Sequence, residues 1–474
     1  MITHWINGQA QKSADGKTFA TINPWTQTKW EDVCEAGQPE VDAAVAAARQ
    51  AFDEGPWPRM GFAERGALIH KLADLIIEHM DELADADTSD MGKPIAAMRA
   101  KDVPRTAQNF RFFADHARLA AAETYPTDTG HHAYSRYEAA GVVAAIAPWN
   151  FPLMLESWKI APALAWGNTV VLKPAEDTPA SATILARLAT EAGIPDGVLN
   201  VIHGFGAEAA GEMLTLHPDI DRITFTGESN TGRHIAAAAA KQLVPVSLEL
   251  GGKGANIVFD DADMDQAISW SNKAIFTNSG QVCLAGSRMF VHSSIFDDFV
   301  ERFVESAKSM VVGDPRDEAT QIASLASEKH FAKVSSFFAD LPEGASVLCG
   351  GVDPDGRWIV HPTVIVGASL DSRICREEVF GPVATIIPFE TEDEAIELAN
   401  DTKYGLNAMI FTENVRRAHR VSAALNAGTV WVNCFFVRDL RAPFGGVGWS
   451  GMGREGGLFS REFFTEPKAV VMEI

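Results

Sequence analysis

The sequence has few cysteines, and none of them is placed for a disulfide framework or a metal site. The five cysteines among 474 residues stand singly, with no CxxC pair and no cysteine–histidine spacing of the kind that binds zinc. The adjacent His131 and His132 are poorly placed to share one ion, because neighbouring side chains point apart. We therefore expect no metal and a reducing, cytoplasmic environment.

Long apolar runs and positive charge are also scarce. No stretch reaches the roughly 18 uninterrupted apolar residues of a membrane-spanning helix. Residues 1–8 lack a basic segment followed by an apolar core, so we expect no signal peptide. The 40 Lys and Arg residues against 63 Asp and Glu give a net charge of −23. This balance argues against nucleic acid or an anionic membrane as a partner, since both would repel the protein.

The chain does have the length and the alternating pattern of a multidomain α/β protein. A hydrophobic content of 46% with 22% charged residues is typical of a globular protein, and 474 residues suggest two or three domains. Predicted strands at 142–147, 169–172, 199–203, 222–226 and 244–250 are separated by predicted helices near 178–192, 207–215 and 230–241. This alternation predicts a parallel sheet that binds ligands at the carboxyl ends of its strands. The pattern repeats from 252 to 449, so we expect the site in the cleft between two units.

Two stretches carry residues suited to covalent catalysis. Glu249 ends a β-branched run and is followed, after Leu250, by two glycines, which predicts a strand breaking into a tight turn. Cys283 lies in a loop of small and polar residues that leaves room for a substrate beside the sulfur. A thiolate is a strong nucleophile, and a nearby carboxylate can activate water against a thioester. Taken singly, each residue is more often structural, as a buried cysteine or a glutamate in an ion pair.

Taken together, the two stretches resemble the active-site signatures of the aldehyde dehydrogenase superfamily, with glutamate before Gly-Gly-Lys and cysteine after Gly-Gln-x. The resemblance covers essentially the whole chain. It implies an α/β aldehyde dehydrogenase fold with a Rossmann-like NAD-binding domain (1–118 and 140–251), an α/β catalytic domain (252–449) and a small β oligomerisation arm (119–139 and 450–474). Such an arm implies a homodimer or a homotetramer.

The same resemblance implies a nucleotide site. Lys173 and Glu176 follow a predicted strand, and in this family they hold the adenosine ribose; the structural alternative is a solvated surface pair. A carboxylate at Glu176 would accept from a ribose 2′-hydroxyl and repel a 2′-phosphate, which predicts NAD rather than NADP. Glu228 departs from the family pattern, where many relatives carry a serine that touches the pyrophosphate, so we expect the phosphate grip to differ there. Further cofactor contacts are implied for Trp149, Gly206, Phe225, Gly227, Leu250, Glu378 and Phe380.

The implied reaction oxidises an aldehyde to an acid without a metal. Residues 148–152 match the family's oxyanion motif, so the Asn150 amide and the Cys283 backbone N–H would donate to the developing oxyanion. The Cys283 thiolate would attack the aldehyde to give a thiohemiacetal, and hydride would pass to NAD⁺. Glu249 would then deprotonate the water that releases the acid from the thioester.

The substrate prediction rests on residues 438–441, Arg-Asp-Leu-Arg, just before Pro-Phe-Gly-Gly. With Asp-Val-Pro before Arg105 and Phe-Thr-Gly before Glu228, this stretch resembles the branch that oxidises 2-hydroxymuconic semialdehyde, its carboxymethyl homologue or 2-aminomuconic semialdehyde. Those substrates carry carboxylates, and we predict that Arg105 and Arg441 bind one. Arg438 ranks below them because Asp439 can pair with it; alternatively, the whole cluster is a structural ion-pair group. Apolar walls are expected from Phe151, Phe435, Phe436 and Phe444.

Other functions remain open at this point. An enzyme with this fold could instead oxidise betaine aldehyde or a broad range of aliphatic and aromatic aldehydes. A CoA-acylating semialdehyde dehydrogenase commonly lacks the glutamate found at Glu249. A thioester or ester hydrolase would not need Lys173 and Glu176, and a non-catalytic protein would not need Cys283 and Asn150.

Overall fold

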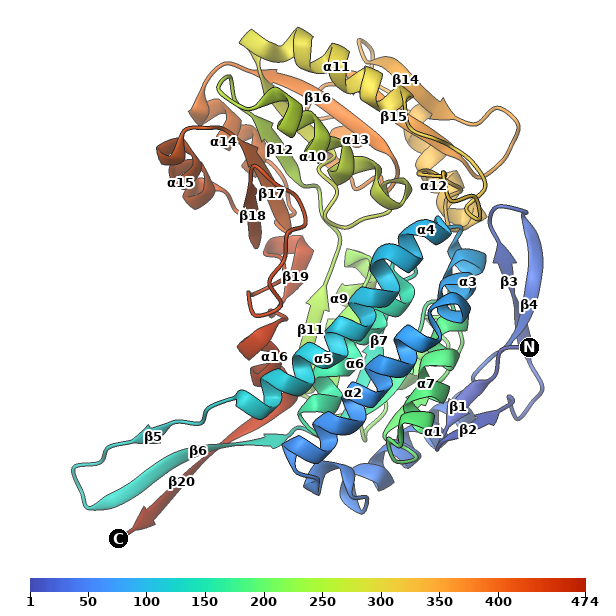
Figure 1. The fold of residues 1–474 in the computed structure, drawn as a ribbon, viewed down its shortest axis with the longest axis vertical. Coiled ribbons are helices and arrows are strands. Elements are labelled where there is room, and N and C mark those ends of the chain that lie inside the picture. The colour runs from blue at the N-terminus through green and yellow to red at the C-terminus, as the bar shows by residue number, and fades with distance from the viewer.

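The computed structural model describes residues 1–474 and contains two α/β units and a projecting arm (Figure 1). The first unit has an eight-stranded sheet in the order β19-β11-β10-β7-β8-β9-β1-β2. Its central strands, β7 to β11, are parallel and fall on the five predicted segments. The strands are β1 (His4–Ile6), β2 (Gln9–Gln11), β7 (Val142–Ile146), β8 (Thr169–Lys173), β9 (Leu199–Val201), β10 (Arg222–Thr226), β11 (Val246–Glu249) and β19 (Gly451–Met452).

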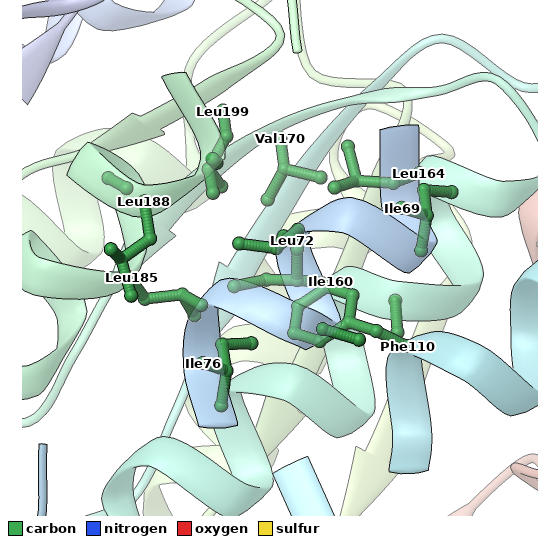
Figure 2. Close-up of a cluster of buried hydrophobic side chains, with 14 of the residues drawn as sticks. Ile69, Leu72, Ile76, Phe110, Ile160, Leu164, Val170, Leu185, Leu188 and Leu199 are labelled. Carbon is green, nitrogen blue, oxygen red and sulfur yellow. The ribbon is translucent and has the colours of Figure 1, made fainter. Parts of the chain in front are cut away.

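Helices of this unit pack on the sheet through apolar stripes. In α2, Ile69, Leu72 and Ile76 recur at helical spacing and face α5, α6 and α7 in one core of 42 buried residues (Figure 2). The helices are α1 (Gln38–Asp53), α2 (Phe62–Glu78), α3 (Met80–Met91), α4 (Ile95–Ala97), α5 (Val103–Leu119), α6 (Pro152–Ala165), α7 (Ala180–Ala192), α8 (Ala210–Thr215) and α9 (Ser229–Ala240). A separate hairpin pairs β3 (Thr18–Asn23) with β4 (Thr28–Cys34).

The strand order positions the site. β7 and β10 are neighbours, but β8 and β9 extend the sheet on one side while β11 extends it on the other. This reversal is a topological switch point, where α/β sheets bind ligands outside the carboxyl ends of the strands. Asn150 follows β7, Gly227 follows β10 and Glu249 ends β11, so all three emerge at this edge.

The second unit is a seven-stranded sheet in the order β14-β15-β16-β13-β12-β17-β18, parallel except for β14. Its strands are β12 (Ala255–Val258), β13 (Arg288–His292), β14 (Ser346–Val352), β15 (Val360–Val366), β16 (Val383–Phe389), β17 (Asn407–Phe411) and β18 (Thr429–Val432). Its helices are α10 (Met264–Phe276), α11 (Phe296–Lys308), α12 (Glu328–Ala339), α13 (Arg373–Arg376), α14 (Glu392–Asn400) and α15 (Val415–Ala424).

The arm is a three-stranded sheet that extends away from both units (Figure 1). Its strands are β5 (Thr124–Tyr125), β6 (His131–Ala139) and β20 (Thr465–Glu473), and β6 is antiparallel to β20 along its whole length. The expected boundary at residue 450 differs from the structure. β19 pairs with β11, and Phe464 at the end of α16 (Gly457–Phe464) is buried in the core of the first unit, so the C-terminal part of the arm begins at Thr465. None of the helices combines the length and apolar character needed to cross a membrane.

Candidate active site

The loop that carries Cys283 is shaped by unusual backbone. Asn278, Ser279 and Gly280 have left-handed φ angles of 54°, 53° and 73°. A Cβ on Gly280 would lie 2.1 Å from the Gly381 carbonyl carbon, so only glycine fits this close approach. A Cβ on Gly252 would lie 2.6 Å from the Cys283 carbonyl oxygen. The glycines after Glu249 therefore let that turn pack directly on the cysteine loop.

Asn150 joins the same constellation from the loop before α6. Its side chain is buried, and its Nδ2 donates to the Gln281 carbonyl at 2.9 Å. The Asn278 side chain donates back to the Asn150 carbonyl at 2.8 Å. One N–H of the Asn150 amide has no protein acceptor and remains available for a ligand beside Cys283. The structure thus brings together the three residues that the sequence singled out for catalysis.

Glu249 is a buried carboxyl group without a hydrogen-bond partner. It is 4% exposed, and neither oxygen is bonded. Burial, reinforced by the negative charge of Glu455, raises the pKa of Glu249 well above its usual range. Lys159 and Arg438 act in the opposite direction. The same burial, with Glu378 and Glu249 nearby, raises the pKa of the Cys283 thiol to about 12.

Sequence reasoning missed the group that surrounds Glu249. Glu455 Oε2 accepts from Trp158 Nε1 at 2.6 Å, and its Oε1 lies 3.3 Å from Lys159 Nζ. Lys159 is fully buried and also donates to Thr224 at 3.1 Å. The one available signal was the pair of charged residues, Glu156 and Lys159, inside a mostly apolar helical run. Glu455 lies in a segment without a periodic pattern.

Two adjoining cavities of about 620 Å³ and 250 Å³ form a cleft that shares Glu176 and ends at Cys283. All nine residues predicted to contact the cofactor line it. The larger cavity includes Lys173, Gly206 and Phe225. The smaller one includes Trp149, Gly227, Leu250, Glu378 and Phe380.

The donors in this cleft suit a dinucleotide. Lys173 Nζ donates to the carbonyls of Pro174 and Gly204 at 2.8 and 2.7 Å and lies 3.8 Å from the half-exposed Glu176. The lysine and the glutamate therefore offer a donor and an acceptor to a ribose. The N-terminus of α9 has no side-chain cap, so its N–H groups are free for a phosphate. These features fit NAD.

Three further residues of the cleft were not predicted to contact a ligand or one another. His330 lies 4.8 Å from the Trp149 ring, and burial lowers its pKa to about 4, so the ring is neutral. Its Nε2 donates to the Phe380 carbonyl at 2.8 Å and supports a residue with a left-handed φ of 60°. Lys333 lies 3.5 Å from Glu228, which turns toward α12.

The two arginines of the Arg-Asp-Leu-Arg stretch have the opposite orientations from those expected. Arg441 is 75% exposed and pairs with Asp439 at 2.6 Å through its Nη2, while its backbone N–H donates to the same carboxylate at 2.9 Å. Arg438 instead points inward, with its guanidinium 4.1 Å from the Trp158 ring and 3.8 Å from the Phe444 ring. Its Nε and Nη2 are buried and unpaired. The expectation that Asp439 would occupy Arg438 is therefore wrong, because Asp439 binds Arg441.

The four phenylalanines expected to form apolar walls differ in burial and in the residues that they contact. Phe151 and Phe435 are buried in the core of the second unit, and the Lys93 amine lies 3.7 Å from the Phe151 ring. Phe444 packs against Arg438. Phe436 is 38% exposed with a left-handed φ of 57°.

Comparison with known proteins is decisive for the family. Residues 11–470 match the model of the aldehyde dehydrogenase family. The chain belongs to this family. It is 47% identical to 2-hydroxymuconic semialdehyde dehydrogenase of Pseudomonas sp. strain CF600, over 100% of this chain and 99% of the relative. It is 45% identical to 2-aminomuconic 6-semialdehyde dehydrogenase of Pseudomonas sp., over 99% and 98%. The NAD⁺ complex of aldehyde dehydrogenase from Bacillus cereus matches with a TM-score of 0.97 and 42% identity, over 100% of this chain and 96% of that one.

This aldehyde dehydrogenase is therefore an NAD-dependent oxidoreductase that oxidises aldehydes. The family assignment confirms the predicted fold class and cofactor. It also removes the hydrolase and the non-catalytic protein as readings of the sequence.

Proposed function

We propose that this aldehyde dehydrogenase oxidises a carboxylated, muconic-type semialdehyde from aromatic ring cleavage, and that it does so in the cytoplasm as a homo-oligomer. The observation that carries the proposal is a pair of neighbouring arginines, the half-buried Arg105 and the inward-pointing Arg438. Neither forms an ion pair with a protein carboxylate, and Arg438 lies within electrostatic range of Arg105, Glu249 and Cys283. A site with two free guanidinium groups is suited to a substrate that brings its own carboxylate.

The electrostatics of Arg438 support this reading. Burial, followed by the positive charge of Arg105, lowers the pKa of Arg438 to about 10, so the group remains a cation at neutral pH. Its buried Nε–H and Nη2–H groups lack acceptors, and an unpaired buried donor is destabilising. A bound carboxylate would supply acceptors and screen the repulsion between the two cations.

The relatives are consistent with such a substrate. Two of them are named for semialdehydes of the muconic series, whose molecules combine a conjugated chain, an aldehyde and a carboxylate. The Arg-Asp-Leu-Arg stretch that suggested this branch supplies Arg438 to the substrate side and Arg441 to a surface turn. We therefore assign carboxylate recognition to Arg105 and Arg438 and no longer to Arg441.

In the proposed mechanism, the Cys283 thiol releases its proton to solvent, and the resulting thiolate attacks the aldehyde carbon to form a thiohemiacetal. The free N–H of Asn150 and the backbone N–H of Cys283 donate to the oxyanion. NAD, when bound in the cleft, supplies the hydride acceptor. Oxidation leaves a thioester on Cys283, and Glu249 accepts a proton from the water that hydrolyses it. The buried cations Lys159 and Arg438 favour the ionised form of Glu249 that this step requires.

Assembly through the arm is argued from exposed apolar surface. Tyr125, Val471, Met472 and Ile474 are between 45% and 86% exposed on a thin sheet that has no core of its own. A small isolated sheet is marginally stable in water, so we expect a second copy of the chain to cover it.

The substrate proposal is tested by comparing 2-hydroxymuconic semialdehyde with hexanal, a neutral aldehyde of equal carbon number, at saturating NAD. We expect kcat/KM to favour the carboxylated substrate by about a hundredfold, since a buried charge-assisted contact is worth roughly 2–5 kcal/mol. A ratio near one would overturn the assignment of the substrate and leave the aldehyde dehydrogenase activity in place.

A further inference from the structure

Arg105 is held by a buried amide that connects the substrate side to α6. Its Nε donates to Asn109 Oδ1 at 3.0 Å, one helical turn further along α5. Asn109 is 1% exposed. Its Nδ2 donates to Ser157 Oγ at 3.0 Å and to the Met154 carbonyl at 3.3 Å.

The orientation of this amide is fixed by its partners. A backbone carbonyl can only accept, so the group that faces Met154 must be the Nδ2 donor. Rotating the amide by half a turn would place Oδ1 against the Met154 carbonyl and an N–H against the Arg105 Nε–H. Both contacts would then be repulsive, and the buried Asn109 amide would lose its hydrogen bonds. Oδ1 therefore has to face Arg105.

This contact determines which edge of the guanidinium is free. A guanidinium binds a carboxylate bidentately, either through Nε and one Nη or through the two Nη atoms. Asn109 occupies Nε, and the Nη atoms of Arg105 form no bond with the protein. Only the edge formed by the two Nη atoms remains available to a ligand.

We infer that Asn109 is a positioning residue for substrate specificity: it occupies the Nε edge of Arg105 and presents the Nη edge to the substrate carboxylate. Because Met154 and Ser157 belong to the helix that follows Asn150, the same amide sets the position of Arg105 relative to the reacting aldehyde. The inference rests on the proposed function and adds the residue that orients the arginine.

The local structure provides a reason for a dedicated anchor. α5 follows a π-helical turn at Met98–Asp102, and such turns change the direction in which the following side chains point. Asp102 forms a buried ion pair with Lys93 and accepts through its carbonyl from Thr106 at 2.9 Å. The start of α5 is therefore fixed from one side by Lys93, and the face that carries Arg105 is fixed to α6 by Asn109.

The test uses 6-oxohexanoate and hexanal, which share a chain length and differ by the carboxylate. In Asn109→Leu, which keeps the number and branching of the side-chain heavy atoms, Arg105 loses its anchor. We expect the KM for 6-oxohexanoate to rise about tenfold relative to the KM for hexanal, with kcat for 6-oxohexanoate little changed. In Asn109→Asp, the new carboxylate forms an ion pair with Arg105 and cannot donate to Ser157 or Met154 of α6. The ratio of the KM for 6-oxohexanoate to the KM for hexanal should rise at least as far in this variant. The matched control is Gln108→Leu, which removes an exposed amide from the same helix and should leave the ratio unaltered.

The outcomes separate this inference from the proposed function. The positioning role of Asn109 would be overturned if the KM values for 6-oxohexanoate and hexanal rose equally. It would also be overturned if the ratio of these two KM values stayed unchanged in either Asn109 variant. If Asn109→Leu does not fold, Asn109→Asp decides by the same criterion. Arg105→Met is measured in parallel. If the KM preference for 6-oxohexanoate over hexanal is lost in Arg105→Met but retained in the Asn109 variants, only the role of Asn109 is overturned. If Arg105→Met retains that preference, the result counts against carboxylate binding by Arg105 itself.

Discussion

At the residue scale, Glu249 separates acylation from hydrolysis. Glu249→Gln keeps the size of the side chain and removes the base that the thioester requires. We expect steady-state turnover to fall by about a thousandfold, in the range of general-base effects, while up to one NADH per active site still forms in a rapid burst. Stopped-flow absorbance measures both phases. Undiminished turnover would exclude Glu249 from the hydrolytic step.

The charge next to Glu249 gives a prediction with a definite sign. The negative charge of Glu455 raises the pKa of Glu249, so Glu455→Gln should lower it. A base is active once it has lost its proton, and its activity rises with pH through its pKa. The rising limb of the kcat profile should therefore move to lower pH in Glu455→Gln. An unchanged limb, or a shift to higher pH, would contradict this electrostatic account.

Some of the site could be predicted from local sequence, and the arginine choice shows why some could not. Glu249, Asn150 and Cys283 each lie within three residues of a glycine or proline that shapes the local backbone, so the local sequence is informative. Which of Arg438 and Arg441 faces inward depends on Asp439. Its carboxylate accepts from the backbone N–H two residues later, a common turn that also captures the Arg441 side chain. Glu455 was not predictable, because only the folded chain brings it to Glu249.

At the scale of elements, α3 and α6 bring buried carboxyl groups together. Asp87 and Glu156 are fully buried, and neither Glu156 oxygen is bonded. Burial raises the pKa of Asp87 to about 7 and that of Glu156 well above its usual range. Unfolded carboxyl groups titrate near pH 4, so the stability these groups contribute is present below that pH and is lost as the pH rises through the folded pKa.

We therefore expect the unfolding temperature of the wild type to fall as the pH rises from about 4 to about 7, the folded pKa of Asp87, and Glu156→Gln and Asp87→Asn to flatten that slope. Differential scanning calorimetry at several pH values measures it, with the exposed Gln108→Leu variant as a reference. Identical slopes in the variants and the wild type would show that these carboxyl groups do not titrate in this range.

Strands with a clear pattern of apolar residues could be predicted from the sequence, and strands without one could not. β7 to β11 were predictable because short apolar strands alternate with amphipathic helices in the sequence. The spacing of the apolar residues identifies each segment as a strand or a helix. β19 was not, because a two-residue strand has no period and is defined only by pairing with β11.

At the scale of the whole molecule, residues of both α/β units line the smaller cavity of the cleft. A thin arm extends away from the two units (Figure 1). Removing residues 465–474 deletes β20 and leaves β6 paired only with the two-residue β5. We expect a loss of assembly, measured by light scattering as a fall from a multiple of 51.2 kDa to a single chain. An unchanged mass would mean that the copies associate through another surface.

The central claim concerns the inward arginine. The most direct measurement is the ratio of kcat/KM for 2-hydroxymuconic semialdehyde to that for hexanal, in wild type, Arg438→Met and Arg441→Met. The account predicts a roughly hundredfold fall in Arg438→Met and no change in Arg441→Met, because Arg441 is exposed and already paired with Asp439. A ratio that survives in Arg438→Met, or collapses in Arg441→Met, would contradict it.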